Sequence, residues 1–163
     1  MNRKGFTLIE ILIVVAIIAI LASVVLVGLG PTQLAGRDAR RLSDLHETQN
    51  GLELYFNKCG YYPGTSVASP CGAWAAVSSW AGLTTSLTGA GLSIRQVPTD
   101  PKAGGTYWYG TDATGGSYIV AALMEQGVGA QVFANYNAPA TAGYTITGLP
   151  AAGCAAPVYC ATL

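Results

Sequence analysis

The longest apolar run of the chain lies near its start and is long enough to cross a membrane. Residues 11–29 contain no charged side chain and one polar side chain, Ser23. As a helix rising about 1.5 Å per residue, this run spans roughly 28 Å, which is close to the apolar thickness of a bilayer. Arg3 and Lys4 precede it, and the positive-inside rule keeps that end in the cytoplasm. The pattern predicts a single-pass inner-membrane anchor whose C-terminal domain lies outside the cytoplasm.

The next segment changes from a continuous apolar run to a periodic one. From residue 35 to residue 56 apolar side chains recur at spacings of three, four and seven, which predicts an amphipathic helix ending near Asn57. Gly30 and Pro31 lie between the two segments, and a proline removes one helical hydrogen bond. We expect a kink or local melting within one long helix, residues 6–30 forming its membrane half and 31–57 its amphipathic half. A true break at Pro31 is the alternative.

Beyond residue 58 the pattern changes to short alternating segments separated by turn residues. Residues 74–87 predict a short helix packed on a sheet, and residues 111–116 predict a turn. The predicted strands are residues 106–109, 117–124 and 144–149, and we expect the first two to form a hairpin. The expected fold class is α+β: a long N-terminal helix whose C-terminal half packs on a small antiparallel sheet, with residues 58–163 forming a globular β-rich domain.

The number and positions of the charged residues argue against some classes of function. Eight basic residues balance eight acidic ones, so no net positive field argues for a nucleic-acid partner. Half of the charged residues lie between Arg37 and Lys58, where Arg40 and Arg41 stand at helical spacing from Asp44. We interpret them as solvated charges on a surface helix, with contacts to neighbouring subunits as the alternative. His46 is the only histidine, and no phosphate-binding loop occurs, so we expect no enzyme site and no cofactor.

Four cysteines, all outside the apolar run, indicate that the domain after this run lies in an oxidising compartment. An even count beyond a membrane helix favours disulfides in an oxidising space, and the spacing does not suit a zinc site. We favour Cys59–Cys71 and Cys154–Cys160, because short loops close at low entropic cost. The other pairings and free buried thiols stay open.

A lone carboxylate, Glu10, lies at the start of the apolar run. A charged group near the apolar part of a membrane costs a few kcal/mol unless it is paired. No lysine or arginine lies at helical spacing on its C-terminal side. We therefore expect its partner elsewhere.

The residues Lys4-Gly5-Phe6-Thr7-Leu8-Ile9-Glu10, followed by an apolar run, resemble the N-terminus of bacterial type IV pilins and type II secretion pseudopilins. The resemblance implies that a membrane prepilin peptidase removes residues 1–5 by cutting between Gly5 and Phe6, and that the new Phe6 amine is methylated. It also implies that Glu10 neutralises the Phe6 α-amine of a neighbouring subunit during assembly. Phe6 and Glu10 are four residues apart, so pairing within one chain stays open.

This resemblance implies a subunit of a homo-oligomeric filament built by machinery in the inner membrane. The chain length and the expected disulfides favour a structural subunit of a type IV pilus, displayed at the cell surface. A type II secretion pseudopilin and a plain membrane-anchored binding module are the alternatives. Pseudopilins can bind calcium near their C-terminal loops, which makes Asp100 and Asp112 weak calcium candidates. Turn formation is the ordinary role for Asp100, and we expect no metal.

Overall fold

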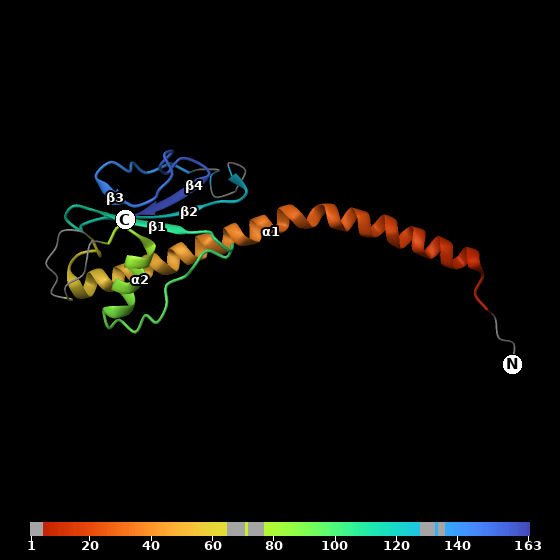
Figure 1. Cartoon of the computed structure of the whole chain (residues 1–163), viewed down its shortest axis with the longest axis horizontal. Coiled ribbons are helices and arrows are strands. Elements are labelled where there is room, and N and C mark those ends of the chain that lie inside the picture. The colour runs from red at the N-terminus through yellow and green to blue at the C-terminus, as the bar shows by residue number, and fades with distance from the viewer. Residues whose placement is uncertain (1–4, 65–70, 72–76, 128–132, 134–135) are drawn as a thin grey trace. The chain divides into compact units, whose positions relative to one another are not determined.

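The computed structural model describes residues 5–64, 71, 77–127, 133 and 136–163 (Figure 1). The chain divides into two compact units, unit 1 (Met1–Leu34) and unit 2 (Ala35–Leu163). The elements in chain order are α1 (Leu8–Cys59), α2 (Trp80–Gly89), β1 (Tyr107–Asp112), β2 (Tyr118–Leu123), β3 (Tyr144–Ile146) and β4 (Val158–Thr162).

Unit 1 consists mainly of the first part of α1, and its described side chains form no core of their own. Its large apolar side chains from Phe6 to Leu26 are between 51% and 84% exposed. A helix that is apolar on every face is stable only where something else covers it, such as lipid or other helices. In length and composition α1 qualifies as a membrane-spanning helix, and the structure contains no membrane.

The long-helix prediction agrees with the structure. One helix runs from Leu8 to Cys59 with Pro31 inside it, so the structure has one helix here and not two. It ends two residues beyond the predicted Asn57. The amphipathic part belongs mostly to unit 2, where residues 35–59 pack against the globular domain.

Unit 2 contains a four-stranded antiparallel sheet with the strand order β3-β1-β2-β4. The predicted hairpin is confirmed, with Tyr107 opposite Ala122 and Thr111 opposite Tyr118. The predicted turn at residues 111–116 is wrong at its start, because Thr111 and Asp112 belong to β1. Their pairing with β3 on the other side overrides their local turn preference.

The last strand is not among the predicted ones. The third expected strand, residues 144–149, is shorter in the structure and ends at Ile146, while Val158–Thr162 forms β4 beside β2. The sequence pattern of residues 154–160 indicates only a disulfide-closed tail, because a five-residue strand next to a proline gives a weak alternating pattern. The chain position of β4, far from β2, hides the pairing that stabilises it.

The predicted short helix is α2, which begins later than expected, at Trp80. Ser79 caps it by accepting a hydrogen bond from the Gly82 N–H at 3.3 Å. The expected start, residue 74, lies outside the described residues.

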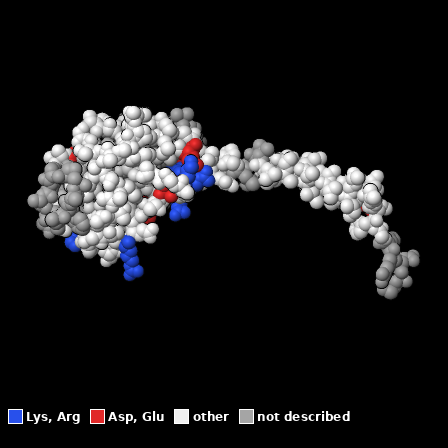
Figure 2. Space-filling view, in the orientation of Figure 1, with Lys and Arg blue, Asp and Glu red and all other residues white. Residues whose placement is uncertain are grey.

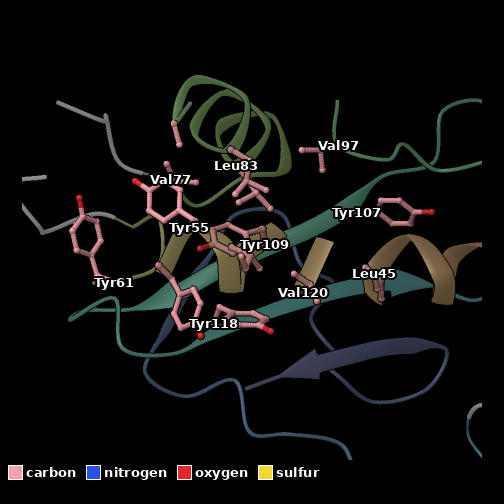
Figure 3. Close-up of a cluster of buried hydrophobic side chains, with 14 of the residues drawn as sticks. Leu45, Tyr55, Tyr61, Val77, Leu83, Val97, Tyr107, Tyr109, Tyr118 and Val120 are labelled. Carbon is pink, nitrogen blue, oxygen red and sulfur yellow. The ribbon is translucent and has the colours of Figure 1, made fainter. Parts of the chain in front are cut away.

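The sheet carries apolar clusters on both faces. In Figure 1 the sheet lies against α2 and the C-terminal part of α1, and Figure 3 shows side chains of these elements pointing toward one another. This main cluster buries aromatic and aliphatic side chains, among them Leu45, Leu52, Tyr55, Leu83, Tyr107, Tyr109 and Val120. The opposite face has a smaller cluster around Ile119, Ala121, Cys154, Val158 and Cys160.

Both expected disulfides are present. Cys59 at the end of α1 bonds to Cys71, and Cys154 bonds to Cys160 in β4. The first bond holds the chain that leaves α1, and the second closes the loop that leads into β4. Together they account for all four cysteines of the sequence.

Candidate functional site

Thr7 and Glu10 form a reciprocal set of hydrogen bonds at the start of α1. Oε2 of Glu10 accepts from the Thr7 backbone N–H and from the Thr7 hydroxyl, each at 2.7 Å. The Thr7 hydroxyl oxygen accepts in turn from the Glu10 N–H at 3.3 Å. This is a capping box, in which two side chains satisfy N–H groups that the first helical turn leaves without partners.

The capping box changes the interpretation of Glu10. The sequence pattern shows no basic partner for Glu10 on its C-terminal side and points to the Phe6 amine, whereas the structure pairs the carboxylate with Thr7. A local signal exists, since Thr-x-x-Glu before an apolar run is typical of a capping box. Both bonds use Oε2, so the carboxylate is held at the helix start while Oε1 makes no hydrogen bond within the described residues.

The expected cleavage site lies just outside the helix. Gly5 and Phe6 precede the first helical residue, Leu8, and both are exposed. A peptide bond outside regular structure can adopt the extended form that a peptidase needs. The structure therefore places Gly5, Phe6 and Glu10 within one short exposed segment.

Comparison with known proteins supports the interpretation of this segment as a prepilin-type N-terminus. Residues 1–26 match the family model of the prokaryotic N-terminal methylation motif. The chain carries a prepilin-type N-terminal segment. The chain is also 34% identical over 65 residues to the type II secretion system core protein G of Escherichia coli (strain K12). That match covers 40% of this chain and 45% of the relative, so the chain spans less than half the length of the protein it matches.

A comparison with solved structures gave no match. The architecture is nevertheless pilin-like and α+β, because a long N-terminal helix is followed by a small four-stranded antiparallel sheet. The predicted resemblance to prepilin-type proteins is confirmed by the motif at residues 1–26. Beyond the prepilin-type segment, the described part of the chain contains a concentrated group of charged side chains.

That group is centred on Arg41, whose side chain is only 2% exposed. Its guanidinium donates to both carboxylate oxygens of Asp100, at 2.8 Å each, and to Asp38 at 2.8 Å. It also forms an ion pair with Glu125 at 2.7 Å. Arg37 donates to the two oxygens of Glu125 at 2.8 and 2.7 Å. Figure 2 shows basic and acidic atoms gathered in this way on a face that otherwise carries little charge.

The Arg41 cluster joins three separate parts of unit 2. Asp38 accepts the backbone N–H groups of Glu125 and Gln126, each at 2.9 Å, and so ties α1 to the end of β2. Asp100 links α1 to the segment before β1. The hydrogen bond from Arg37 is the main cause that lowers the pKa of Glu125, from 4.5 to about 2. Hydrogen bonds to Asp100 are the main cause that raises the pKa of Arg41, so its guanidinium stays protonated at neutral pH.

The interpretation of these charges as a solvated helix face is wrong for three of them. Asp38, Arg41 and Asp44 are buried. Asp44 accepts from the Tyr107 hydroxyl at 2.7 Å. Asp38 lies three residues from Arg41 on the same helix, but the other two partners, Asp100 and Glu125, lie about 60 and 85 residues further along the chain, so helical spacing could not identify them. Arg40 and His46 are exposed, as expected for the solvated face. Nδ1 of His46 lies 3.2 Å from Oε1 of Gln49.

The two calcium candidates have protein partners. Asp100 binds Arg41 and also accepts the Lys102 N–H at 2.8 Å, in the turn role expected of it. Asp112 accepts from Thr114 and from the Gly116 N–H in the β1–β2 turn. Within the described residues, no group of three or more His, Cys, Asp or Glu side chains is placed to hold a metal.

Proposed function

We propose that the chain is a structural, non-enzymatic subunit of a type IV pilus filament. It is made as a single-pass membrane precursor, cut between Gly5 and Phe6, methylated at Phe6 and polymerised by packing of α1. The proposal rests on the prepilin-type segment at residues 1–26. This segment includes the start of a helix whose apolar side chains are exposed on every face. Lipid covers that helix in the precursor, and helices of other copies cover it in the filament.

Cleavage supplies the partner for Glu10. It removes the charges of Arg3 and Lys4 and creates an ammonium group at Phe6. Among apolar helices an unpaired ammonium is costly, and the penalty falls when a carboxylate meets it. The capping box leaves Oε1 of Glu10 without a partner within the described residues, so it can accept from the Phe6 amine of a neighbouring copy. Such a contact sets the axial register of an incoming subunit, in a heterologous, helical assembly that does not close.

Cleavage, membrane extraction and polymerisation each require a different partner of the chain. A prepilin peptidase acts on the cytoplasmic side, assembly machinery in the inner membrane extracts the subunit, and further copies of the chain complete the filament. The finished filament stands outside the cytoplasm, where both disulfides are stable.

A type II secretion pseudopilin is the second candidate. The similarity to the core protein G of a type II secretion system favours it. The C-terminal loop closed by Cys154–Cys160 favours the pilus, since an exposed filament subunit gains from a cross-linked loop.

Mass spectrometry of the assembled protein tests the proposal. The expected N-terminal residue is a methylated Phe6, in filaments that are purified from the cell surface and contain this chain as a component. An intact Met1 in functional protein would contradict the proposal and favour a plain membrane-anchored binding module. A methylated Phe6 in envelope-bound protein, with no surface filament, would favour the pseudopilin.

A further inference from the structure

The sheet of unit 2 has two edge strands, β3 and β4. The outer edge of such a strand presents N–H and C=O groups on which a strand of another molecule can pair. β3 is three residues long, whereas β4 has five residues and is the longer template. What closes the edge of β4 therefore decides whether two copies can join through their sheets.

The ladder with β2 shows which groups of β4 point outward. The Met124 N–H donates to the Pro157 oxygen at 2.9 Å, so Pro157 faces β2. In an antiparallel pair the backbone groups of successive residues alternate between the partner strand and the opposite side. Val158, Cys160 and Thr162 accordingly direct their backbone groups to the free edge.

Two of these three positions are already occupied within the chain. The Val158 N–H donates to the Ala155 oxygen at 3.0 Å. The Cys160 N–H donates to the Tyr136 hydroxyl at 2.9 Å, and that hydroxyl lies 3.4 Å from the Cys160 oxygen. One phenol group thus takes the place that a neighbouring strand would take at the middle of β4.

Aromatic packing holds the Tyr136 ring at this edge. Its centroid lies 5.2 Å from that of Phe133 and 5.1 Å from that of Tyr159. Ring pairs in such edge-to-face and tilted arrangements stabilise one another beyond the effect of their buried area. The hydroxyl is therefore held in position and not merely resting on the strand.

At the opposite side of the sheet, the chain makes one pair of contacts just beyond the end of β3. The Thr147 N–H, directly after β3, donates to the Ser78 oxygen at 2.8 Å, and the two side-chain hydroxyls lie 2.7 Å apart.

We infer that Tyr136 is an edge cap that prevents β4 from pairing with a strand of a second copy of this chain. With the middle of β4 capped, two copies cannot pair through this strand. The inference concerns hydrogen bonds within one chain, so it holds whether or not the chain forms filaments.

The test uses the full-length, unprocessed chain in detergent micelles, which cover the apolar helix and separate the outcome from filament assembly. Tyr136→Phe removes the capping hydroxyl and keeps the ring. Tyr159→Phe is the matched control, because the Tyr159 ring belongs to the same cluster and its hydroxyl makes no hydrogen bond within the described residues. In Tyr136→Phe kept dilute enough to be monomeric, we expect hydrogen exchange at the Cys160 amide to be about fivefold faster than in the parent. We also expect concentration-dependent dimers in light scattering, and neither effect in Tyr159→Phe.

A third variant distinguishes edge pairing from misfolding. Thr162→Pro removes an outward N–H and leaves the ladder with β2 intact, so adding it to Tyr136→Phe should abolish the dimers. Unchanged exchange at Cys160 in Tyr136→Phe would overturn the inference. So would dimers that form equally in Tyr159→Phe, or dimers that persist in the Thr162→Pro double variant.

Discussion

The two units of this chain differ in which side chains they expose and which they bury. Unit 1 exposes every large apolar side chain from Phe6 to Leu26 and keeps the one charged side chain of its helix, Glu10, in a local capping box. Unit 2 buries its apolar side chains on both faces of a sheet and encloses even a guanidinium, that of Arg41. The comparison shows that unit 2 covers its own apolar side chains and pairs its buried charges, whereas unit 1 depends on a partner or on lipid.

The largest effect on unit 2 is expected from Arg41→Ala. The substitution leaves Asp38, Asp100 and Glu125 close together without their shared cation. Removing one partner of a buried ion pair costs about 3–5 kcal/mol. Denaturation of the full-length protein in detergent, followed by circular dichroism, measures the loss.

Arg40→Ala is the matched control, because Arg40 is the exposed neighbour on the same helix. We expect it to change stability by no more than about 0.5 kcal/mol. Similar losses for the two variants would show that the Arg41 cluster does not hold unit 2 together.

Acid should weaken the same cluster. The pKa of Glu125 falls from 4.5 to about 2 on folding, so its ionised form stabilises the folded state fully above pH 4.5. That contribution is lost as the pH drops through 2. Denaturation midpoints measured between pH 5 and 2 should therefore decrease.

Glu125→Gln isolates this contribution. The variant should be less stable than the parent at neutral pH and should lose less stability over the same pH range. An equally steep decrease in both proteins would assign the acid sensitivity to other carboxylates.

A smaller effect is expected at the start of unit 1. Thr7→Ala removes the hydroxyl of the capping box, which typically costs about 1 kcal/mol of helix stability. In micelles the amides of the first turn should exchange faster, while Thr7→Ser keeps the hydroxyl and should match the parent. Equal protection in Thr7→Ala and Thr7→Ser would mean that the capping box does not stabilise the helix start.

Sequence patterns predict the features whose partners lie nearby in the chain. The apolar run, the amphipathic helix, the β1–β2 hairpin and the two short-loop disulfides depend on spacings of a few residues. The Arg41 cluster and β4 escape prediction because their partners, Asp100, Glu125 and β2, lie some 35 to 85 residues away. The Thr7–Glu10 capping box is different, because its local Thr-x-x-Glu signal is present in the sequence. The prediction missed it because it treated Glu10 only as a charge that needs a cationic partner.

The central claim is that copies associate through unit 1 once Phe6 is the first residue. The most direct test compares filament yield, by electron microscopy, from cells that produce Glu10→Ala and from cells that produce Arg40→Ala. We predict that Glu10→Ala is still cleaved after Gly5, keeps a folded unit 2 and forms few or no filaments, while Arg40→Ala forms them normally. Normal filaments from Glu10→Ala would contradict the account.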